Sequence, residues 1–442
     1  MRDRPAPTRR TLLLDIPAWC AATWLTLLVL LMWSYGANNV ALPGLPIPLV
    51  DIALIALLVR SRRSWRSFTN EPTGRLLLAL LTALAVVVAI RLYIDIPRYG
   101  IAAARGALFA VEAWAVLLGA AVARRVGRER TTSLLGASFA IALAWYALFP
   151  FRSQLIALSP TVGIRRSTPL FAFTSIGLVG PWCLLWFGLR RTTTAWIGAV
   201  VGIVVVLIAQ LRGSLAGTIG AIALITLAAR RSQRRAGRRL IASIALGVAA
   251  GVVVLSIAPT TGRLGAVRLD SYVDLALSAV GQQTSVASSF NDRVEWFETT
   301  VETIRTTRLG WLSGVGFGVD LTGGFGIAGS DVVNPHNDLL EFYARLGVFV
   351  IAWLAMWVVV LRVFWRRARS GDRLALWGLG AWVTMVAGSL TQPYNSFAYG
   401  GMVWWLLAGL VLGSQVTPSS RTIAPQETAG GDPVDLPSST SR

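Results

Sequence analysis

The feature that most constrains the fold of this chain is a series of long apolar segments separated by clusters of arginine. The apolar segments are roughly 17–25 residues long, which is the length that an α-helix needs to cross a bilayer. Apolar residues make up 55% of the 442 residues. Because backbone polar groups inside a bilayer must be hydrogen-bonded within the protein, such segments indicate helices rather than open sheets. We therefore expect an all-α polytopic membrane protein.

Twelve apolar segments are candidate transmembrane helices. They lie near residues 13–34, 46–60, 75–94, 101–123, 133–149, 168–189, 193–211, 214–229, 239–258, 338–361, 374–391 and 397–414. The predicted organisation is nine helices within residues 1–258, a large loop at 259–337, three helices within 338–414 and a disordered tail at 415–442. The tail prediction rests on its many Ser, Thr, Pro and Gly residues.

The positions of the arginines predict the orientation in the membrane. All 41 basic residues are arginine, and 28 of them fall in the N-terminal segment, in alternate connections or in the C-terminal tail. By the positive-inside rule these parts face the cytoplasm. Both termini are then cytoplasmic, and loop 259–337 lies on the external face of the cytoplasmic (inner) membrane. The net charge of +20 is explained in this way by membrane lipids and topology, and requires no nucleic-acid partner.

The large loop is itself expected to be partly helical. It holds five arginines and eight acidic residues, so it is not a basic patch. Residues 291–308 have apolar side chains at helical spacing, and Asn291 and Asp292 can cap such a helix. Residues 310–329 contain eight glycines, including Gly-Val-Gly-Phe-Gly at 314–318. A glycine-rich loop can direct backbone N–H groups at an anion, but an irregular connector is the commoner explanation.

His336 is the only histidine, and it lies in Asn-Pro-His-Asn-Asp at 334–338, where the loop meets the tenth apolar segment. Imidazole is well suited to proton transfer near neutral pH, which makes His336 a candidate catalytic residue. We expect it to begin the tenth helix, whose N-terminus favours the neutral ring. Asp338 and Glu341 favour the charged ring, so its protonation state stays open. The alternative role for His336 is packing or hydrogen bonding at a helix end.

Several arginines are expected at the external face: Arg91, Arg98, Arg165, Arg166, Arg212 and Arg293. Arg212 lies in a short break between two apolar segments. A charged side chain at membrane level usually faces a cavity or a partner, and the guanidinium group binds phosphate oxygens through two donors. The alternative for each arginine is contact with lipid headgroups. Arg105 and Glu112, seven residues apart in the fourth segment, are expected to share a helix face and to neutralise each other.

The sequence offers little for binding a metal ion. The two cysteines, Cys20 and Cys183, both lie in apolar segments, so neither a disulfide nor a thiolate metal site is indicated. A single histidine with scattered carboxylates is also a poor set of ligands for a divalent ion. We expect no metal and no other cofactor.

Three motifs together resemble the O-antigen ligase and O-antigen polymerase superfamily of bacterial envelope glycosyltransferases. Pro-His-Asn-Asp-Leu-Leu at 335–340, followed by Arg-Leu-Gly-Val at 345–348, is similar to the family's His-Asn signature after its large external loop. Arg-Val-Glu-Trp at 293–296, leading to the glycines at 314–318, resembles the family's arginine–tryptophan and Gly-x-Gly pairing. Leu-Arg-Gly-Ser at 211–214 resembles a Ser-Arg-Gly element, with leucine in place of serine.

The resemblance implies a GT-C-like fold and metal-independent transfer of a glycan from a polyprenyl (undecaprenyl) diphosphate carrier, outside the cytoplasmic membrane. It places the family's essential histidine on His336 and its diphosphate-contacting arginines on Arg212, Arg293 and Arg166. The chain departs from the family near Arg166. Many relatives have asparagines there, whereas this chain has Phe-Ala-Phe-Thr at 171–174, so the contacts to the donor sugar or the acceptor are expected to differ.

We therefore expect an inverting glycosyltransferase whose acceptor is a hydroxyl on a lipid, a protein or another glycan. The sequence does not separate a ligase from a polymerase, identify the sugar or give the oligomeric state. The alternative is a membrane transporter or flippase for a lipid-linked or anionic substrate. Transporters of this size often consist of two repeated halves, and this sequence has no convincing internal repeat.

Overall fold

The computed structural model describes residues 41–42, 45–151, 173–190, 192–229, 234–257, 261–262, 265–267, 269–279, 288–323, 326–327, 330–331, 334–396 and 400–414. The first predicted helix at 13–34, Cys20, Arg166 and the tail at 415–442 lie outside the described residues, so the predictions made for them are not tested by the fold.

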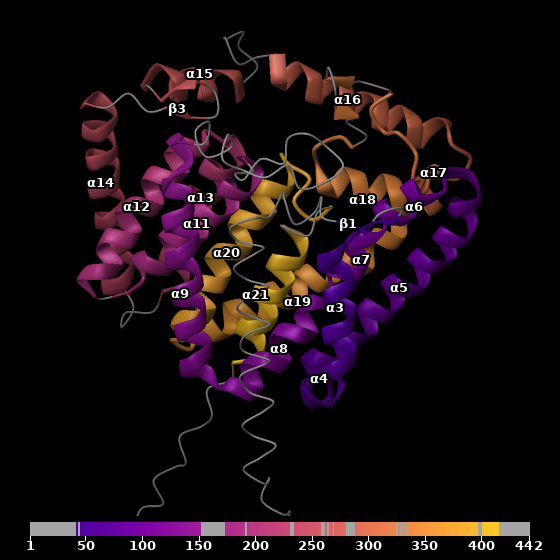
Figure 1. Ribbon diagram of the computed structural model, residues 1–442, viewed down its shortest axis with the longest axis horizontal. Coiled ribbons are helices and arrows are strands. Elements are labelled where there is room, and N and C mark those ends of the chain that lie inside the picture. Colours follow the sequence, from indigo (N-terminus) through magenta and orange to yellow (C-terminus); the bar gives the residue numbers. More distant parts are fainter. Residues whose placement is uncertain are drawn as a thin grey trace, which may run out of the picture.

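The described part of the chain is almost entirely helical, as predicted (Figure 1). Its strands form three short antiparallel hairpins, which pair β1 (Ala41–Leu42) with β2 (Leu45–Pro48), β3 (Thr261–Gly262) with β4 (Gly265–Ala266), and β5 (Gly326–Ile327) with β6 (Ser330–Asp331).

The helices of the bundle follow the predicted apolar segments from the second onward. They are α3 (Leu49–Arg60), α4 (Arg62–Thr69), α5 (Pro72–Tyr99), α6 (Ile101–Gly106), α7 (Leu108–Glu112), α8 (Ala115–Val126), α9 (Arg128–Ala147), η1 (Phe149–Phe151), α11 (Phe173–Gly188), α12 (Thr193–Ala209), α13 (Arg212–Ala228), α14 (Arg234–Ile257), α18 (Asp338–Leu346), η3 (Gly347–Val350), α19 (Ile351–Arg369), α20 (Arg373–Ser389) and α21 (Gly401–Gly413). The loop between α14 and α18 contains α15 (Leu269–Ala279), α16 (Ser288–Thr306) and α17 (Gly310–Ser313).

Three stretches in the described residues are long and apolar enough to cross a membrane: Pro72–Tyr99, Ile101–Val126 and Asp338–Arg369. The second combines α6, α7 and α8, and the third combines α18, η3 and α19. Large apolar side chains of α5, such as Leu76, Val86 and Ile90, are exposed, which suits a helix that faces lipid. The protein is therefore an integral membrane protein, whereas the number of crossings stays a prediction.

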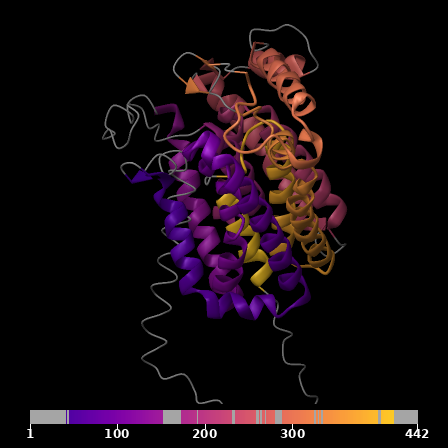
Figure 2. The same ribbon diagram turned by 90° about the vertical axis from the view of Figure 1, so that its right-hand side faces the viewer.

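The bundle has two distinct ends. We call one the loop end, because α15, α16, α17 and the start of α18 lie there, and α16 lies across the top of the bundle (Figures 1 and 2). We call the other the arginine end, because α4 and the ends of α8 and α19 lie there with their arginines. The hydroxyl group of Tyr272 in α15 donates a hydrogen bond to the Leu207 carbonyl near the end of α12. This contact attaches the loop to the bundle.

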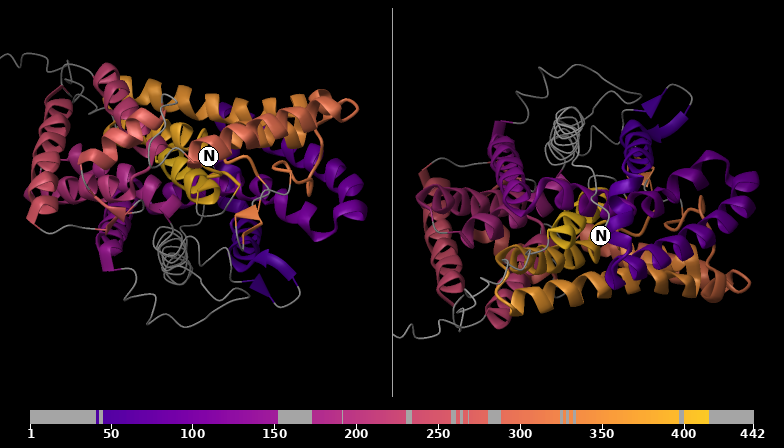
Figure 3. Two further views of the ribbon diagram at one scale, coloured as in Figure 1. Left: turned by 90° about the horizontal axis from the view of Figure 1, so that it is seen from above. Right: turned by 90° about the horizontal axis from the view of Figure 1, so that it is seen from below.

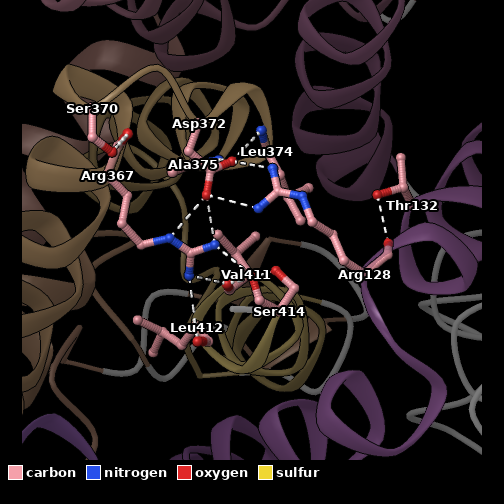
Figure 4. A network of polar contacts seen from close by, with 10 residues as sticks. All are labelled: Arg128, Thr132, Arg367, Ser370, Asp372, Leu374, Ala375, Val411, Leu412 and Ser414. Carbon is pink, nitrogen blue, oxygen red and sulfur yellow. Dashed lines mark hydrogen bonds and ion pairs between the residues drawn. The ribbon is translucent and has the colours of Figure 1, made fainter. Parts of the chain in front are cut away.

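At the arginine end, Asp372 joins four helices through two arginines (Figure 4). Arg128 donates two hydrogen bonds to its carboxylate, at 2.6 and 3.1 Å. Arg367 also donates to that carboxylate and, at 2.6 and 2.7 Å, to the Val411 and Ser414 carbonyls. The same carboxylate caps α20 by accepting hydrogen bonds from backbone amides of its first turn. The starts of α9 and α20 and the ends of α19 and α21 are therefore held together.

The centre of the bundle is packed with small and aromatic residues. A Cβ atom at Gly119 of α8 would lie 2.2 Å from the Leu406 carbonyl oxygen, and one at Gly409 of α21 would lie 2.1 Å from that of Val116. Such close approach of two helices is typical of membrane proteins, where small residues allow backbone contact. Beside this contact, the rings of Trp357 and Trp404 stack at a centroid distance of 5.2 Å. Figure 3 shows α21 near the middle of the bundle.

Candidate active site at the loop end

His336 lies in a tight turn immediately before α18. The Asn334 side chain accepts a hydrogen bond from the His336 amide, at 3.3 Å. Asn337 is the N-cap of α18, and its side chain accepts from the Leu340 amide at 3.0 Å. The prediction that His336 begins the helix is therefore wrong by two residues. The reason is that Asn337 satisfies an amide of the first turn, which favours asparagine at the cap.

The backbone of His336 is in the left-handed region, with φ at +52°. This conformation costs about 1–2 kcal/mol in a residue with a side chain, although histidine adopts it more readily than most residues. Such residues persist where their surroundings hold them, and they cluster at functional sites. Asn334 on one side and the capped helix on the other hold this turn.

The indole ring of Trp296, in α16, lies next to the imidazole ring of His336. The two ring centroids are 5.1 Å apart, at 41° between planes, and Trp296 is buried. The predicted loop helix is thus present, but it begins at Ser288, so Asn291 and Asp292 lie within its first turns instead of capping it. Arg293 is three residues before Trp296, which puts both on the same helix face. Arg293 is half-buried.

The glycine-rich loop is bound by charged side chains of the protein itself. The Phe317 amide donates to the Asp95 carboxylate at 2.8 Å. Arg345 donates to the Gly316 and Val319 carbonyls at 3.1 and 2.6 Å. The Phe317 N–H, which could have faced an external anion, is therefore taken by an internal carboxylate. The loop is a connector, as expected, but an ordered one across residues 314–323.

Asp95 was not noted in the sequence, and Arg345 was noted only as part of the motif at 345–348. The signal that could have found them is an ionisable residue within an apolar segment or at its end, because such residues need partners in a membrane protein. Arg91, one of the arginines expected at the external face, pairs with Asp95, and its guanidinium lies 3.4 Å from that carboxylate. Of the other arginines expected at the external face, Arg98 is exposed on α5.

Arg105 and Glu112 do not share a helix face, so that expectation is wrong. The fourth segment is interrupted after Gly106, and the two residues belong to different helices, α6 and α7. Arg105 is exposed and Glu112 is buried. The seven-residue spacing places two side chains on one face only in a continuous helix.

Arg212 begins α13 at the loop end. It follows Gln210, whose φ of +47° turns the chain between α12 and α13. A Cβ atom at Gly213 would lie 2.1 Å from the Thr391 hydroxyl oxygen, so the first turn of α13 packs directly on the residues after α20. Arg212 itself is half-buried.

The residues after α20 also contact the turn that carries His336. The Asn395 amide and side chain donate to the buried Asp338 carboxylate at 2.8 and 2.9 Å. Asp338 is two residues after His336. The fold therefore links the turn of Arg212 to the turn of His336 through residues 391–395, while α16 brings Arg293 and Trp296 from another side.

Three of the four predicted site residues, His336, Arg212 and Arg293, thus lie at the same end of the bundle, and Arg166 is outside the described residues. Their roles stay predictions. In the described part of the chain, no group of three or more His, Cys, Asp or Glu side chains is arranged to hold a metal ion.

Residues 197–355 match the family model described as O-antigen ligase. The matched segment includes Arg212, Arg293, Trp296 and His336. It confirms the resemblance to the O-antigen ligase superfamily that the motifs had indicated. No match is found among curated proteins.

Proposed function

Because residues 197–355 match the O-antigen ligase family and the chain is an integral membrane protein, we propose that it is a metal-independent inverting glycosyltransferase. It moves a glycan from a polyprenyl diphosphate carrier to an acceptor hydroxyl at the external face of the cytoplasmic membrane. The observation that carries the proposal is the only histidine of the chain, held in a left-handed turn against Trp296 where α16 meets α18.

In the proposed reaction, the acceptor oxygen attacks the anomeric carbon of the donor sugar. The bond from that carbon to the diphosphate oxygen breaks, and the diphosphate leaves with the bonding electrons. His336 takes the proton of the acceptor hydroxyl, a contribution of about 10²–10⁴-fold to the rate. Attack opposite the leaving group inverts the anomeric centre.

Arg212 and Arg293 are proposed to bind the diphosphate. The negative charge on the leaving oxygens increases in the transition state, and fixed cations in a partly desolvated site stabilise that charge. Both residues are half-buried at the loop end, and the guanidinium group remains charged there. We assign the same role to Arg166, on the resemblance alone.

The two ends of the bundle fit this reaction on a membrane. The arginine end faces the cytoplasm by the positive-inside rule, and the loop end then faces outward with His336. Exposed apolar faces such as that of α5 provide a place for the polyprenyl tail. A ligase and a polymerase use the same parts and differ in the acceptor, which is a lipid or protein in one case and a carrier-linked glycan in the other.

A transporter would use interrupted helices near the middle of the membrane. Two of the long apolar stretches are indeed interrupted, at α6–α8 and at η3. Both interruptions adjoin the glycine-rich loop: a Cβ atom at Gly106 would lie 3.6 Å from the Phe317 ring, and one at Gly347 would lie 2.6 Å from the Gly314 amide. The interruptions therefore lie beside the glycine-rich loop at the loop end, which favours the glycosyltransferase over the transporter.

The proposal is tested by reconstituting the purified protein in vesicles with a polyprenyl diphosphate oligosaccharide and candidate lipid, protein and glycan acceptors. We expect transfer to one acceptor class, in the presence of excess EDTA, with inverted configuration of the new glycosidic bond by NMR. Retained configuration, or activity that needs added magnesium or manganese, would contradict the mechanism. Movement of intact donor across the bilayer without transfer would support the transporter instead.

A further inference from the structure

We propose that Asp95 and Arg345 are positioning residues, which fix the loop at 314–319 and thereby seat α16 against the turn that carries His336. The link to turnover rests on the proposed function. The structural part of the inference concerns only where α16 lies, and it can be tested without substrate.

Asp95 holds the loop from the side of the bundle. It belongs to α5, in an apolar segment, and it is 1% exposed. Burial of a carboxylate is costly unless donors satisfy it, and here the donors are the Phe317 amide at 2.8 Å and Arg91 at 3.4 Å. The Phe317 ring is fully buried near Phe109, at a centroid distance of 6.2 Å. Both the backbone and the ring of Phe317 are thus attached to the bundle.

Arg345 holds the loop from α18. It is 4% exposed, and it donates to the carbonyls of Gly316 and Val319. Its guanidinium also lies 3.9 Å from the Glu341 carboxylate. A carboxylate therefore binds an amide of the loop, and a guanidinium binds carbonyls on either side of that amide. Hydrogen bonds of this kind, in which one partner is charged, are stronger than those between neutral groups.

Glycine is required where the side chains reach the loop backbone. Gly314, Gly316 and Gly318 all have positive φ, at +76°, +99° and +85°. A Cβ atom at Gly316 would lie 2.2 Å from the Arg91 guanidinium and 2.6 Å from the Asp95 carboxylate. The loop conformation therefore depends both on these glycines and on the charged side chains that pack against them.

The loop in turn positions α16. A small hydrophobic cluster joins them, made of Ile304 from α16, Val315 and Leu321 from the loop, and Ala344 from α18. The hydroxyl of Thr300 donates to the Leu321 carbonyl at 2.9 Å. Thr300 is one helical turn after Trp296, whose ring contacts His336. If the loop shifts, α16 loses this support, and Trp296 and Arg293 move with it.

The first test is kinetic. Asp95→Leu removes the acceptor of the Phe317 amide, and Gly316→Ala perturbs the same contact from the other side. We expect each to lower kcat by on the order of 10–100-fold, because small misplacement of reacting groups has effects of that size. We also expect the KM for the donor to rise, because Arg293, which is proposed to bind the diphosphate, moves with α16. Asp95→Asn keeps an acceptor oxygen and should restore most of the turnover. The control is Tyr93→Leu, which changes an 85% exposed residue of the same helix.

The second test measures the position of α16 directly. Spin labels are placed at Glu302→Cys in α16 and Ile90→Cys in α5, both exposed sites, in a background with Cys20→Ala and Cys183→Ala. We expect a narrow distance distribution in the parent protein, in Tyr93→Leu and in His336→Ala. Asp95→Leu and Gly316→Ala should broaden or shift it.

Normal turnover in Asp95→Leu, or reduced turnover with an unchanged distance distribution, would overturn the inference. The proposed function fails separately: His336→Ala that remains active contradicts the catalytic assignment, whatever the spin-label distances show.

Discussion

At the scale of single residues, three side chains of the turn at 334–337 have different roles. Asn334 and Asn337 bind backbone amides, and this leaves His336 in a conformation that few residues adopt. The imidazole lies against Trp296 at the start of α18. The turn therefore holds the imidazole against Trp296 at the loop end, a placement that suits the proposed role of His336 as a general base.

Arg212 provides a prediction at this scale. Arg212→Lys keeps the positive charge but loses the two-pronged contact with phosphate oxygens, so it should reduce transfer about tenfold or more. Arg212→Ala should also raise the donor KM. Steady-state kinetics at equal amounts of folded protein would check both, because loss of this half-buried residue can also disturb the turn between α12 and α13. A fully active Arg212→Ala variant would exclude a role in binding the diphosphate.

At the scale of elements, Asp372 caps α20 and pairs with Arg128 and Arg367 (Figure 4). Burial raises the pKa of Asp372, but the hydrogen bonds and charges of the two arginines outweigh burial and hold the pKa below its ordinary value. A carboxyl whose pKa is lower in the folded state stabilises the protein above its unfolded-state pKa, about 3.9. That contribution is lost as the pH falls through the lower pKa of the folded state.

We therefore predict that Asp372→Asn, which keeps a good helix cap, lowers stability at pH 7 by about 2 kcal/mol. The value is less than for a fully buried pair, because the Arg128 side chain is 29% exposed. Thermal unfolding in detergent would measure it. The difference between parent and variant should shrink as the pH falls below 4. A difference that is the same at pH 7 and pH 3 would show that ionisation of Asp372 is not its cause.

The helices were largely predictable from the sequence, whereas the contacts between them were not. Apolar length located most helices of the bundle from α3 onward, since that signal is local, whereas α4 (Arg62–Thr69) lies in an arginine-rich connection and was not predicted. The interruption of the fourth segment was missed; it lies where Gly106 contacts Phe317, a residue far away in the sequence. Asp95 and Phe317 are 222 residues apart, and no local pattern indicates such a pairing. The family motifs located His336, but not its left-handed conformation.

At the scale of the whole molecule, the separation of a loop end from an arginine end predicts the orientation in the membrane. In a background without Cys20 and Cys183, Glu302→Cys at the loop end should react with a membrane-impermeant thiol reagent in intact cells. Ser370→Cys at the arginine end should react only after the membrane is permeabilised. Both positions are exposed in the protein. The opposite labelling would place His336 in the cytoplasm and contradict the proposed reaction.

The central claim, that His336 accepts the proton of the acceptor hydroxyl, leads to one decisive comparison. Asparagine tolerates the left-handed backbone of this turn but is no base at neutral pH, so His336→Asn removes the chemistry and spares the conformation. Single-turnover transfer and binding of the lipid-linked donor are measured on the purified parent and variant. We predict that the variant binds the donor normally and transfers its glycan at least about 100-fold more slowly. A folded His336→Asn protein with near-normal single-turnover rate would contradict the account.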